Sequence, residues 1–405
     1  MTSFDTSPTL NVWRALLALA VVFVMLATTG WTAMRNQRDQ TPLQASITAW
    51  EHGRLDGHPL PDPHAAPARL AAFFATLGDA QRALLAHRYP LAVGNMNGAP
   101  VEVRYEANRV ALAQAREVER QRIHDPRLSP DGQHEAGRRM HRLDALMKPG
   151  RNILAFDPEG SGRVAEVYGD LDRAERISIV VPGVDTDLLS FQRTTGKYSA
   201  PAGMAESLYT AERAVSPGTR TAVIAWADYT APSGIGVDAA TATRAAQGAV
   251  RLDALVRALP GAAPVSLFCH SYGSVLCGVV ARLLPRRVAD IAVAGSPGMR
   301  AETVSRLRTS ARVWAMRDAD DWIQDVPYLE LGGLGHGADP VSRAFGARVL
   351  SAVGARGHAG YFEPGTESLR NFAEIGVGAY GSVHCADDAD TCMTGMPADA
   401  GAGRA

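Results

Sequence analysis

The pattern of hydrophobic and polar positions changes its period near residue 150. From residue 70 to about residue 150, apolar side chains recur at helical spacing, as in Leu70, Phe73 and Leu77. Beyond residue 153, short apolar runs alternate with helical stretches, and the runs cover residues 163–168, 177–181, 221–226, 265–268, 290–294 and 312–316. This alternation predicts an α/β domain with a mostly parallel central sheet flanked by helices.

Two further segments refine this α/β domain. Residues 158–162, Pro-Glu-Gly-Ser-Gly, predict the turn of an antiparallel hairpin that precedes the parallel strands. Residues 238–259 are rich in alanine and carry apolar side chains at helical spacing. We expect this helix to cover one face of the sheet.

The N-terminal segment has the pattern of a membrane anchor. Residues 15–34 carry no charge, and a helix of that length spans about 30 Å, the thickness of a bilayer core. Trp13 and Trp31 lie where interfacial aromatic side chains are expected. We expect a single-pass membrane protein, with a cleaved signal peptide and a secreted product as the alternative. The positive charges on the two sides are nearly balanced, so they leave the orientation open.

These patterns divide the chain into five parts. They are an N-terminal tail and transmembrane anchor at residues 1–34, a polar and proline-rich linker at 35–69, a helical extension at 70–150, the α/β domain at 151–380 and a loose tail at 381–405.

The composition narrows the classes of function. The chain has 405 residues, 46% of them hydrophobic, which excludes disorder over most of its length. Its 41 Lys and Arg residues face 42 Asp and Glu residues, a balance that argues against a nucleic-acid partner. Four cysteines are too few for a disulfide scaffold.

The strongest chemical signal is an apolar strand that runs through a turn into a helix. Residues 265–268 are followed by Cys269-His270-Ser271-Tyr272-Gly273-Ser274 and then by a helix-forming run at 275–284. This order predicts a nucleophile elbow, in which a sharp turn lifts the Ser271 hydroxyl clear of the sheet. Cys269 replaces the usual first glycine of that motif. We expect His270 to shape the turn, because side chains of neighbouring residues in a sharp turn point apart.

A nucleophilic serine needs a base and an acid that orients the base. In chain order the acid should follow a late strand, here residues 313–316, and Asp318, Asp320 and Asp321 all do so. His336, His358 and His384 follow as candidate bases. The residues alone leave these alternatives open.

An oxyanion hole needs two backbone N–H groups near the nucleophile. One should come from Tyr272, directly after the serine, and the other from the loop after an earlier strand. The strand at 177–181 ends in Pro182-Gly183-Val184, so Gly183 or Val184 is expected to supply the second N–H group.

The motifs together resemble an actinobacterial α/β-hydrolase family long catalogued as a domain of unknown function. The likeness covers residues 70–380 and runs through Gly94-Asn95-Met96-Asn97-Gly98, Ala107-Asn108-Arg109, Val181-Pro182-Gly183, Trp226-Ala227-Asp228-Tyr229, the elbow, Gly295-Ser296-Pro297-Gly298, His336-Gly337-Ala338-Asp339-Pro340 and Phe345-Gly346-Ala347. It implies an α/β-hydrolase fold with an N-terminal helical extension. It also implies serine hydrolase activity on poorly defined substrates.

The resemblance assigns roles that the residues alone leave open. It implies Ser271 as the nucleophile, Asp321 in Asp321-Trp322-Ile323 as the acid, and His358 in Gly357-His358-Ala359-Gly360-Tyr361 as the base. Asp318 is the alternative acid. His336 is the alternative base, although we expect it to fix a loop next to Asp339.

The cysteines give information about the cellular compartment in which the domain lies. Cys385 and Cys392 are close enough in sequence to form a disulfide, which would suit an extracytoplasmic domain, and free thiols are the alternative. We expect Cys269 and Cys277 to act as small buried apolar residues.

The sequence therefore predicts a membrane-anchored serine hydrolase with a small-molecule or lipid-like ester substrate and no cofactor or metal. Amide hydrolysis and acyl transfer to another acceptor are possible variants of this chemistry. The alternative from another class is a non-catalytic, membrane-tethered binding module that keeps the hydrolase fold.

Overall fold

A computed structural model describes residues 40–386 and 391–396 of the chain. The anchor predicted at residues 15–34 lies outside these residues. Within the described ranges, no helix is both long and apolar enough to cross a membrane.

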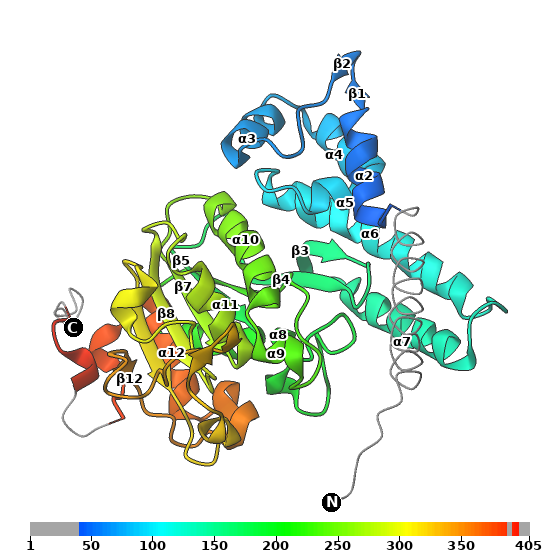
Figure 1. The fold of residues 1–405 in the computed structure, drawn as a ribbon. Helices are drawn as coiled ribbons and strands as arrows, with labels where there is room; N and C mark the ends of the chain where they lie inside the picture. Colours follow the sequence, from blue (N-terminus) through cyan, green and yellow to red (C-terminus); the bar gives the residue numbers. More distant parts are fainter. Residues whose placement is uncertain (1–39, 387–390, 397–405) are drawn as a thin grey trace, which may run out of the picture.

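An eight-stranded sheet forms the centre of the molecule (Figure 1). In spatial order its strands are β12 (Arg348–Val349), β9 (Arg312–Met316), β8 (Val288–Ala294), β7 (Val265–His270), β5 (Arg176–Val181), β6 (Thr221–Ala227), β4 (Arg163–Gly169) and β3 (Asn152–Asp157). The strands from β12 to β6 pair in parallel, and β4 pairs antiparallel with both β6 and β3. The predicted antiparallel hairpin before the parallel strands is confirmed.

Helices cover both faces of this sheet. On one face, α10 (Thr243–Ala258) and α11 (Tyr272–Val280) enclose an apolar core with the strands. On the other, α8 (Pro201–Val215) and α12 (Glu367–Val377) enclose a second core. The helix predicted at 238–259 is observed as α10, preceded by the short α9 (Val237–Ala240). The continuous apolar runs of the central strands follow from this burial on both faces.

A helical region precedes the sheet and stands beside it in Figure 1. It contains α2 (Pro42–Glu51), the small hairpin β1 (Arg54–Leu55) and β2 (His58–Pro59), α3 (Pro67–Ala75), α4 (Asp79–Arg88), α5 (Pro90–Gly94), α6 (Val101–Arg122) and α7 (Pro130–Leu146). The helical character predicted for residues 70–150 is confirmed.

The prediction of a linker at residues 35–69 is wrong for its described part. Thr41 caps α2 by accepting a hydrogen bond from the backbone N–H of Gln44, and Pro42 starts the helix. Trp50 is fully buried against Phe74 and Tyr89. Its indole N–H donates to the carbonyl of Pro61 at 2.7 Å. The prolines of this segment therefore shape turns that pack on a core.

The described part of the predicted tail at 381–405 is also packed. Leu350 forms a β-bridge with Cys385, and Cys392 is buried in the second sheet core. A disulfide joins Cys385 to Cys392. Its crosslink and buried apolar contacts hold a segment whose composition alone suggests a loose end.

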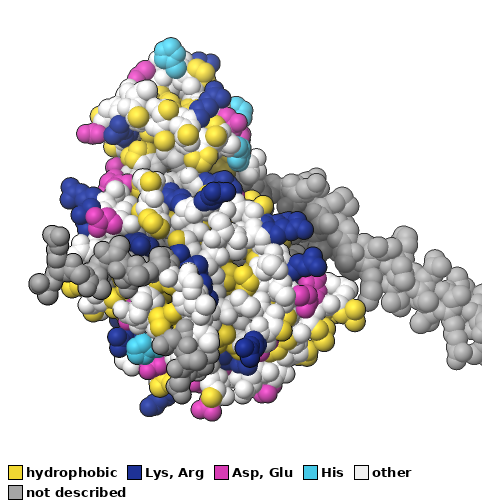
Figure 2. Space-filling model, turned by 90° about the vertical axis from the view of Figure 1, so that its left-hand side faces the viewer, with side chains coloured by type: hydrophobic (Ala, Val, Ile, Leu, Met, Phe, Trp, Pro, Cys, Tyr) yellow, Lys and Arg dark blue, Asp and Glu magenta, His cyan; other side chains and the backbone are white. Residues whose placement is uncertain are grey.

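The surface seen in Figure 2 mixes basic, acidic and apolar side chains. Arginine and lysine side chains lie among acidic and neutral groups rather than in one continuous field. Many arginines form surface ion pairs, as Arg120 does with Glu117. This mixture agrees with the balanced charge of the sequence.

Candidate active site

Ser271 lies at the sharp turn between β7 and α11. Its backbone adopts φ 54° and ψ −129°, a conformation that is strained for a residue with a side chain. Gly273 makes the turn possible, since a Cβ at that position would lie 2.3 Å from the carbonyl oxygen of Val181. The predicted nucleophile elbow therefore has the expected strand, turn and helix.

A disulfide joins Cys269, at the end of β7, to Cys277 in α11. The prediction that these two residues act only as buried apolar side chains is wrong. Their Cα atoms are 6.5 Å apart, because the elbow folds the first turns of the helix back along the strand. The departure from glycine at position 269 thus supplies a crosslink beneath the elbow.

Three side chains from distant parts of the chain form a continuous hydrogen-bonded series. His358 Nε2 lies 2.8 Å from Ser271 Oγ. His358 Nδ1 lies 2.8 Å from Asp321 Oδ1 and 3.1 Å from Oδ2. The structure therefore brings together Ser271, His358 and Asp321, the three residues that the resemblance implied.

Asp321 is fully buried and has several donors. The Tyr361 hydroxyl donates to Oδ2 at 2.5 Å, and the backbone N–H of Ile323 donates to Oδ1 at 3.0 Å. Burial by itself raises the pKa of Asp321, but the hydrogen bonds from His358, Tyr361 and Ile323 outweigh it and hold the pKa below its usual value. The carboxylate therefore stays ionised beside the imidazole.

The other two candidate acids do not reach the imidazole. Asp318 accepts hydrogen bonds from the backbone N–H groups of Gly357 and Asp320, at 2.8 and 3.2 Å. Asp320 is exposed. Asp318 thus holds the loop that carries His358. His358 itself follows the very short strand β12 and lies in a 3-10 helix at Gly357–Phe362.

The remaining histidines are held in structural contacts. His270 Nε2–H donates to the backbone carbonyl of His358 at 2.6 Å, which fits the expectation that His270 shapes the site. His336 Nε2–H donates to the carbonyl of Ala239 at 2.7 Å. Asp339 pairs with Arg317 at 2.7 Å rather than with His336. His384 lies 3.4 Å from Glu367 in the C-terminal region.

The loop after β5 lies against the nucleophile, as expected for an oxyanion loop. A Cβ on Gly183 would lie 2.6 Å from Ser271 Cβ and 3.0 Å from its Oγ, so only glycine fits here. Among the described residues, the backbone N–H groups of Gly183, Val184 and Tyr272 donate no hydrogen bond. They are free to bind a developing negative charge.

Three residues contribute to the site without belonging to the predicted triad or oxyanion hole. Tyr361 fixes Asp321 through its hydroxyl. Gly295, at φ 55°, leaves the space for the acid and base, because a Cβ there would lie 2.8 Å from Asp321 Oδ2. The Trp322 ring lies 4.8 Å from the His358 ring, centroid to centroid. All three belong to motifs that carry the resemblance, and this membership is the signal that could have found them.

A groove of about 690 Å³ lies beside the oxyanion loop. Its walls include Asp185 and Thr186 from the loop after β5, and Pro232, Asp238 and Arg244 from the segment after β6. No group of three or more His, Cys, Asp or Glu residues in the described ranges is arranged to hold a metal ion.

Residues 157–331 match the model of a family described as alpha/beta hydrolase. This part of the chain has the α/β-hydrolase fold. The match includes Ser271 and Asp321 but ends before His358. The resemblance inferred from the motifs is thereby confirmed over these residues.

The curated relatives that this chain matches are mycobacterial. An uncharacterized protein of Mycobacterium tuberculosis (strain ATCC 25618 / H37Rv) is 25% identical over 379 residues, which cover 79% of this chain and 57% of the relative. An uncharacterized protein of Mycobacterium bovis is 30% identical over 170 residues, which cover 39% of this chain and 62% of the relative. The chain thus spans a little over half the length of the first of these relatives.

Solved structures show more distant similarity. The 2,6-dihydroxy-pseudo-oxynicotine hydrolase is 12% identical, with 86% of this chain and 93% of that chain covered and a TM-score of 0.34. A dienelactone hydrolase from Anabaena variabilis is 16% identical, with 55% and 93% covered and a TM-score of 0.32. Similarity at this level carries no information about the substrate.

Proposed function

We propose that the protein is a serine hydrolase that cleaves carboxylic esters through an acyl-enzyme. The observation that carries this proposal is the series of hydrogen bonds from Ser271 through His358 to the buried carboxylate of Asp321. A serine at a strained elbow with a base and an orienting acid is the arrangement that nucleophilic catalysis requires.

In the proposed reaction, Ser271 Oγ attacks the ester carbonyl carbon while its proton passes to His358 Nε2. The carbonyl oxygen becomes an oxyanion and accepts hydrogen bonds from the N–H of Tyr272 and that of Gly183 or Val184. The C–O bond to the alcohol then breaks as His358 returns the proton to the departing oxygen. Water, deprotonated by His358, attacks the acyl-enzyme and releases the carboxylic acid and Ser271.

The surroundings of the site favour an apolar, lipid-like ester. Trp322, which packs on His358, is 47% exposed. Ile235, in the segment after β6, and Leu331, in the small hairpin of β10 (Glu330–Leu331) and β11 (Leu334–Gly335), are 80% and 77% exposed. A β-bridge between Thr241 and Leu334 joins the two segments. Tyr272 connects this surface to the elbow, because its hydroxyl donates to the carbonyl of Thr241 at 2.7 Å. Exposed apolar side chains in contiguous loops are typical of surfaces that bind apolar ligands.

We further propose that the domain works outside the cytoplasm. Both cysteine pairs of the chain are disulfide-bonded, Cys269 with Cys277 and Cys385 with Cys392. Disulfides persist in oxidising compartments and are rare in the cytosol. The same reasoning fits the membrane anchor or the signal peptide predicted at the N-terminus.

The test is hydrolysis of 4-nitrophenyl acetate, butyrate and octanoate by wild type and two serine variants. We expect Ser271→Ala to lower kcat/KM by about 10³-fold or more, because the nucleophile is lost. Ser296→Ala is the matched control, since Ser296 is also buried and also lies in a Ser-x-Gly sequence. It should change the rate by less than about tenfold.

Two outcomes would contradict the proposal. One is an unchanged rate in a folded Ser271→Ala variant. The other is absence of hydrolysis of all three esters by a folded wild type, which would favour the non-catalytic binding module.

A further inference from the structure

A second cavity lies between the helical region and the sheet, away from Ser271. Its volume is about 520 Å³. Its walls come from α2, α5, α6, β3, β6 and α10, together with the turns around Pro63 and Asn97. The Gly94–Gly98 and Trp226–Tyr229 motifs, which supply no residue of the proposed triad or oxyanion hole, both contribute to it through Asn97 and Trp226.

Arg104 of α6 is a buried cation in this cavity. The residue is 5% exposed, and its Nε donates to the carbonyl of Gly94 at 3.2 Å. This is the only hydrogen bond that the Arg104 side chain makes among the described residues, and it leaves both Nη groups without a partner there. A guanidinium has five N–H donors, so a buried arginine with one of them engaged has a strong need for an acceptor.

The neighbouring charges do not neutralise Arg104. Asp228 is bound by both oxygens to Arg251, at 2.6 and 2.7 Å, so these two charges cancel. Burial lowers the pKa of Arg104 to about 10, with Asp228 opposing that effect. Arg104 therefore remains a cation at neutral pH and leaves one uncompensated positive charge at the cavity.

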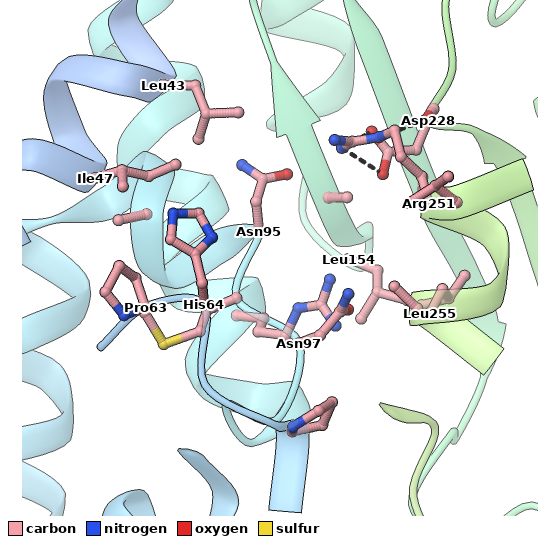
Figure 3. A pocket seen from close by; sticks show the side chains of 18 of the residues that line it. Leu43, Ile47, Pro63, His64, Asn95, Asn97, Leu154, Asp228, Arg251 and Leu255 are labelled. Carbon is pink, nitrogen blue, oxygen red and sulfur yellow. Dashed lines mark hydrogen bonds and ion pairs between the residues drawn. The ribbon is translucent and has the colours of Figure 1, made fainter. Parts of the chain in front are cut away.

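The rest of the cavity is largely apolar. Figure 3 shows Leu43 and Ile47 of α2 on one side and Leu255 of α10 on the other. Val250, which is 67% exposed, stands at the rim. The amide of Asn97 adds a further polar group to the wall.

We propose that this cavity binds an organic monoanion, a carboxylate that carries a hydrocarbon chain. The carboxylate accepts hydrogen bonds from the Arg104 Nη groups and the Asn97 amide, and the chain packs between Leu43, Ile47 and Leu255. One excess positive charge matches one negative charge, and a fork of two N–H donors matches a planar carboxylate. The volume lies within the usual range for small-molecule sites.

The proposed site lies behind the oxyanion loop and does not depend on hydrolysis. Trp226 lines the cavity and stacks on Tyr229 with ring centroids 5.7 Å apart. The Tyr229 hydroxyl donates to the carbonyl of Pro182 at 2.7 Å. A ligand in the cavity therefore contacts a ring that packs on the support of Gly183, but it contacts none of Ser271, His358 and Asp321.

The test is calorimetric titration of the full chain with sodium decanoate, with decanol as the neutral probe. We expect one decanoate per chain, and at least about tenfold weaker binding of decanol because it lacks the charge. Arg104→Gln should weaken decanoate binding by at least about tenfold. Arg109→Gln, on the exposed side of the same helix, is the matched control and should bind as wild type does.

Two further variants keep the result interpretable. Leu43 is a half-buried residue of the apolar wall. Leu43→Trp places a larger side chain in the cavity and leaves Arg104 in place, so it should also weaken decanoate binding. Ser271→Ala should bind decanoate as wild type does, whether or not the protein hydrolyses esters. The proposal is overturned if wild type binds no decanoate, if Arg104→Gln or decanol matches wild-type decanoate binding, or if Ser271→Ala abolishes it.

Discussion

Two clusters of polar side chains in this protein differ in how completely the protein satisfies them. In the candidate active site, Asp321 is fully buried yet bound by His358, Tyr361 and a backbone N–H group. In the cavity beneath the helical region, Arg104 is almost as buried but uses one of its donors.

The difference indicates two kinds of function. A charge whose partners all come from the protein is fixed in place, which suits a group that must hold a catalytic imidazole in one orientation. A buried charge without partners lowers the stability of the empty protein, and a ligand of opposite charge relieves that cost. We therefore propose a reaction at the first cluster and ligand binding at the second.

The largest expected effect comes from neutralising the acid of the first cluster. Asp321→Asn keeps the shape but removes the charge that orients and stabilises protonated His358. We expect kcat to fall by about 10³ to 10⁴-fold. Steady-state kinetics on a 4-nitrophenyl ester would measure this.

Asp318→Asn is the matched control, because Asp318 touches backbone N–H groups and not the imidazole. It should lower kcat by less than about tenfold. Equal losses in the two variants would contradict the assignment of the acid.

The next effect concerns pH. Burial, with the nearby His358, lowers the pKa of His270 to about 3 from the ordinary 6.5. Between these values the unfolded chain binds a proton that the folded protein does not, so stability falls as the pH falls through this window. At pH 4, keeping His270 neutral lowers the free energy of unfolding by about 3 kcal/mol.

Urea unfolding of wild type and His270→Gln between pH 7 and pH 4 measures this contribution. The variant keeps an N–H donor for the carbonyl of His358 but cannot be protonated in this range. Its stability should decline less steeply with acid. If the free energy of unfolding falls equally with pH in the two proteins, His270 is not held neutral.

A smaller effect is expected from the crosslink beneath the elbow. Replacing Cys269 and Cys277 together by alanine should lower the free energy of unfolding by about 2 kcal/mol, since the closed loop is short. It should also lower the esterase rate, because the strained turn loses its support. Thermal unfolding measures the change in stability, and steady-state kinetics measures the change in the rate of ester hydrolysis.

Replacing Cys385 and Cys392 together by alanine provides the comparison for that crosslink. It should leave the rate unchanged, since this pair lies in the C-terminal segment. An elbow variant as stable and as active as wild type would refute the supporting role.

The smallest effect, which is expected for Arg104→Met, is the most informative about the second cluster, and Arg251→Met is its comparison. Arg251→Met leaves the buried Asp228 without its bidentate partner and should cost about 3 kcal/mol. Arg104→Met removes a buried charge that has no counter-charge, so stability should change by less than about 1 kcal/mol or rise. A loss of equal size in both variants, measured by urea unfolding, would indicate that Arg104 is a structural residue.

The sequence predicted the elbow well because its signal is local. Strand, turn and helix follow one another within residues 265–284, and steric rules decide which residue is lifted from the sheet. The acid and base come from loops distant in sequence. Spacing therefore left three aspartates and three histidines open, and the resemblance to a family was needed to choose Asp321 and His358.

Other features escaped prediction because they depend on contacts between distant segments. Trp50 is buried by Phe74 of α3 and by Tyr89, which lies between α4 and α5, so an expected linker is part of a core. The Cys269–Cys277 crosslink depends on how the helix folds back on its strand. The cavity around Arg104 is enclosed by elements from residue 43 to residue 255, and no local pattern reports such an enclosure.

The central claim is that Ser271 is an activated nucleophile, and covalent labelling tests it most directly. Wild type, Ser271→Ala and His358→Ala would be treated with a fluorophosphonate, which reacts with activated serines, and the modified peptide identified by mass spectrometry. We predict one adduct, on Ser271, formed by wild type and strongly reduced without His358. An adduct on another serine, or none on a folded wild type, would contradict the account.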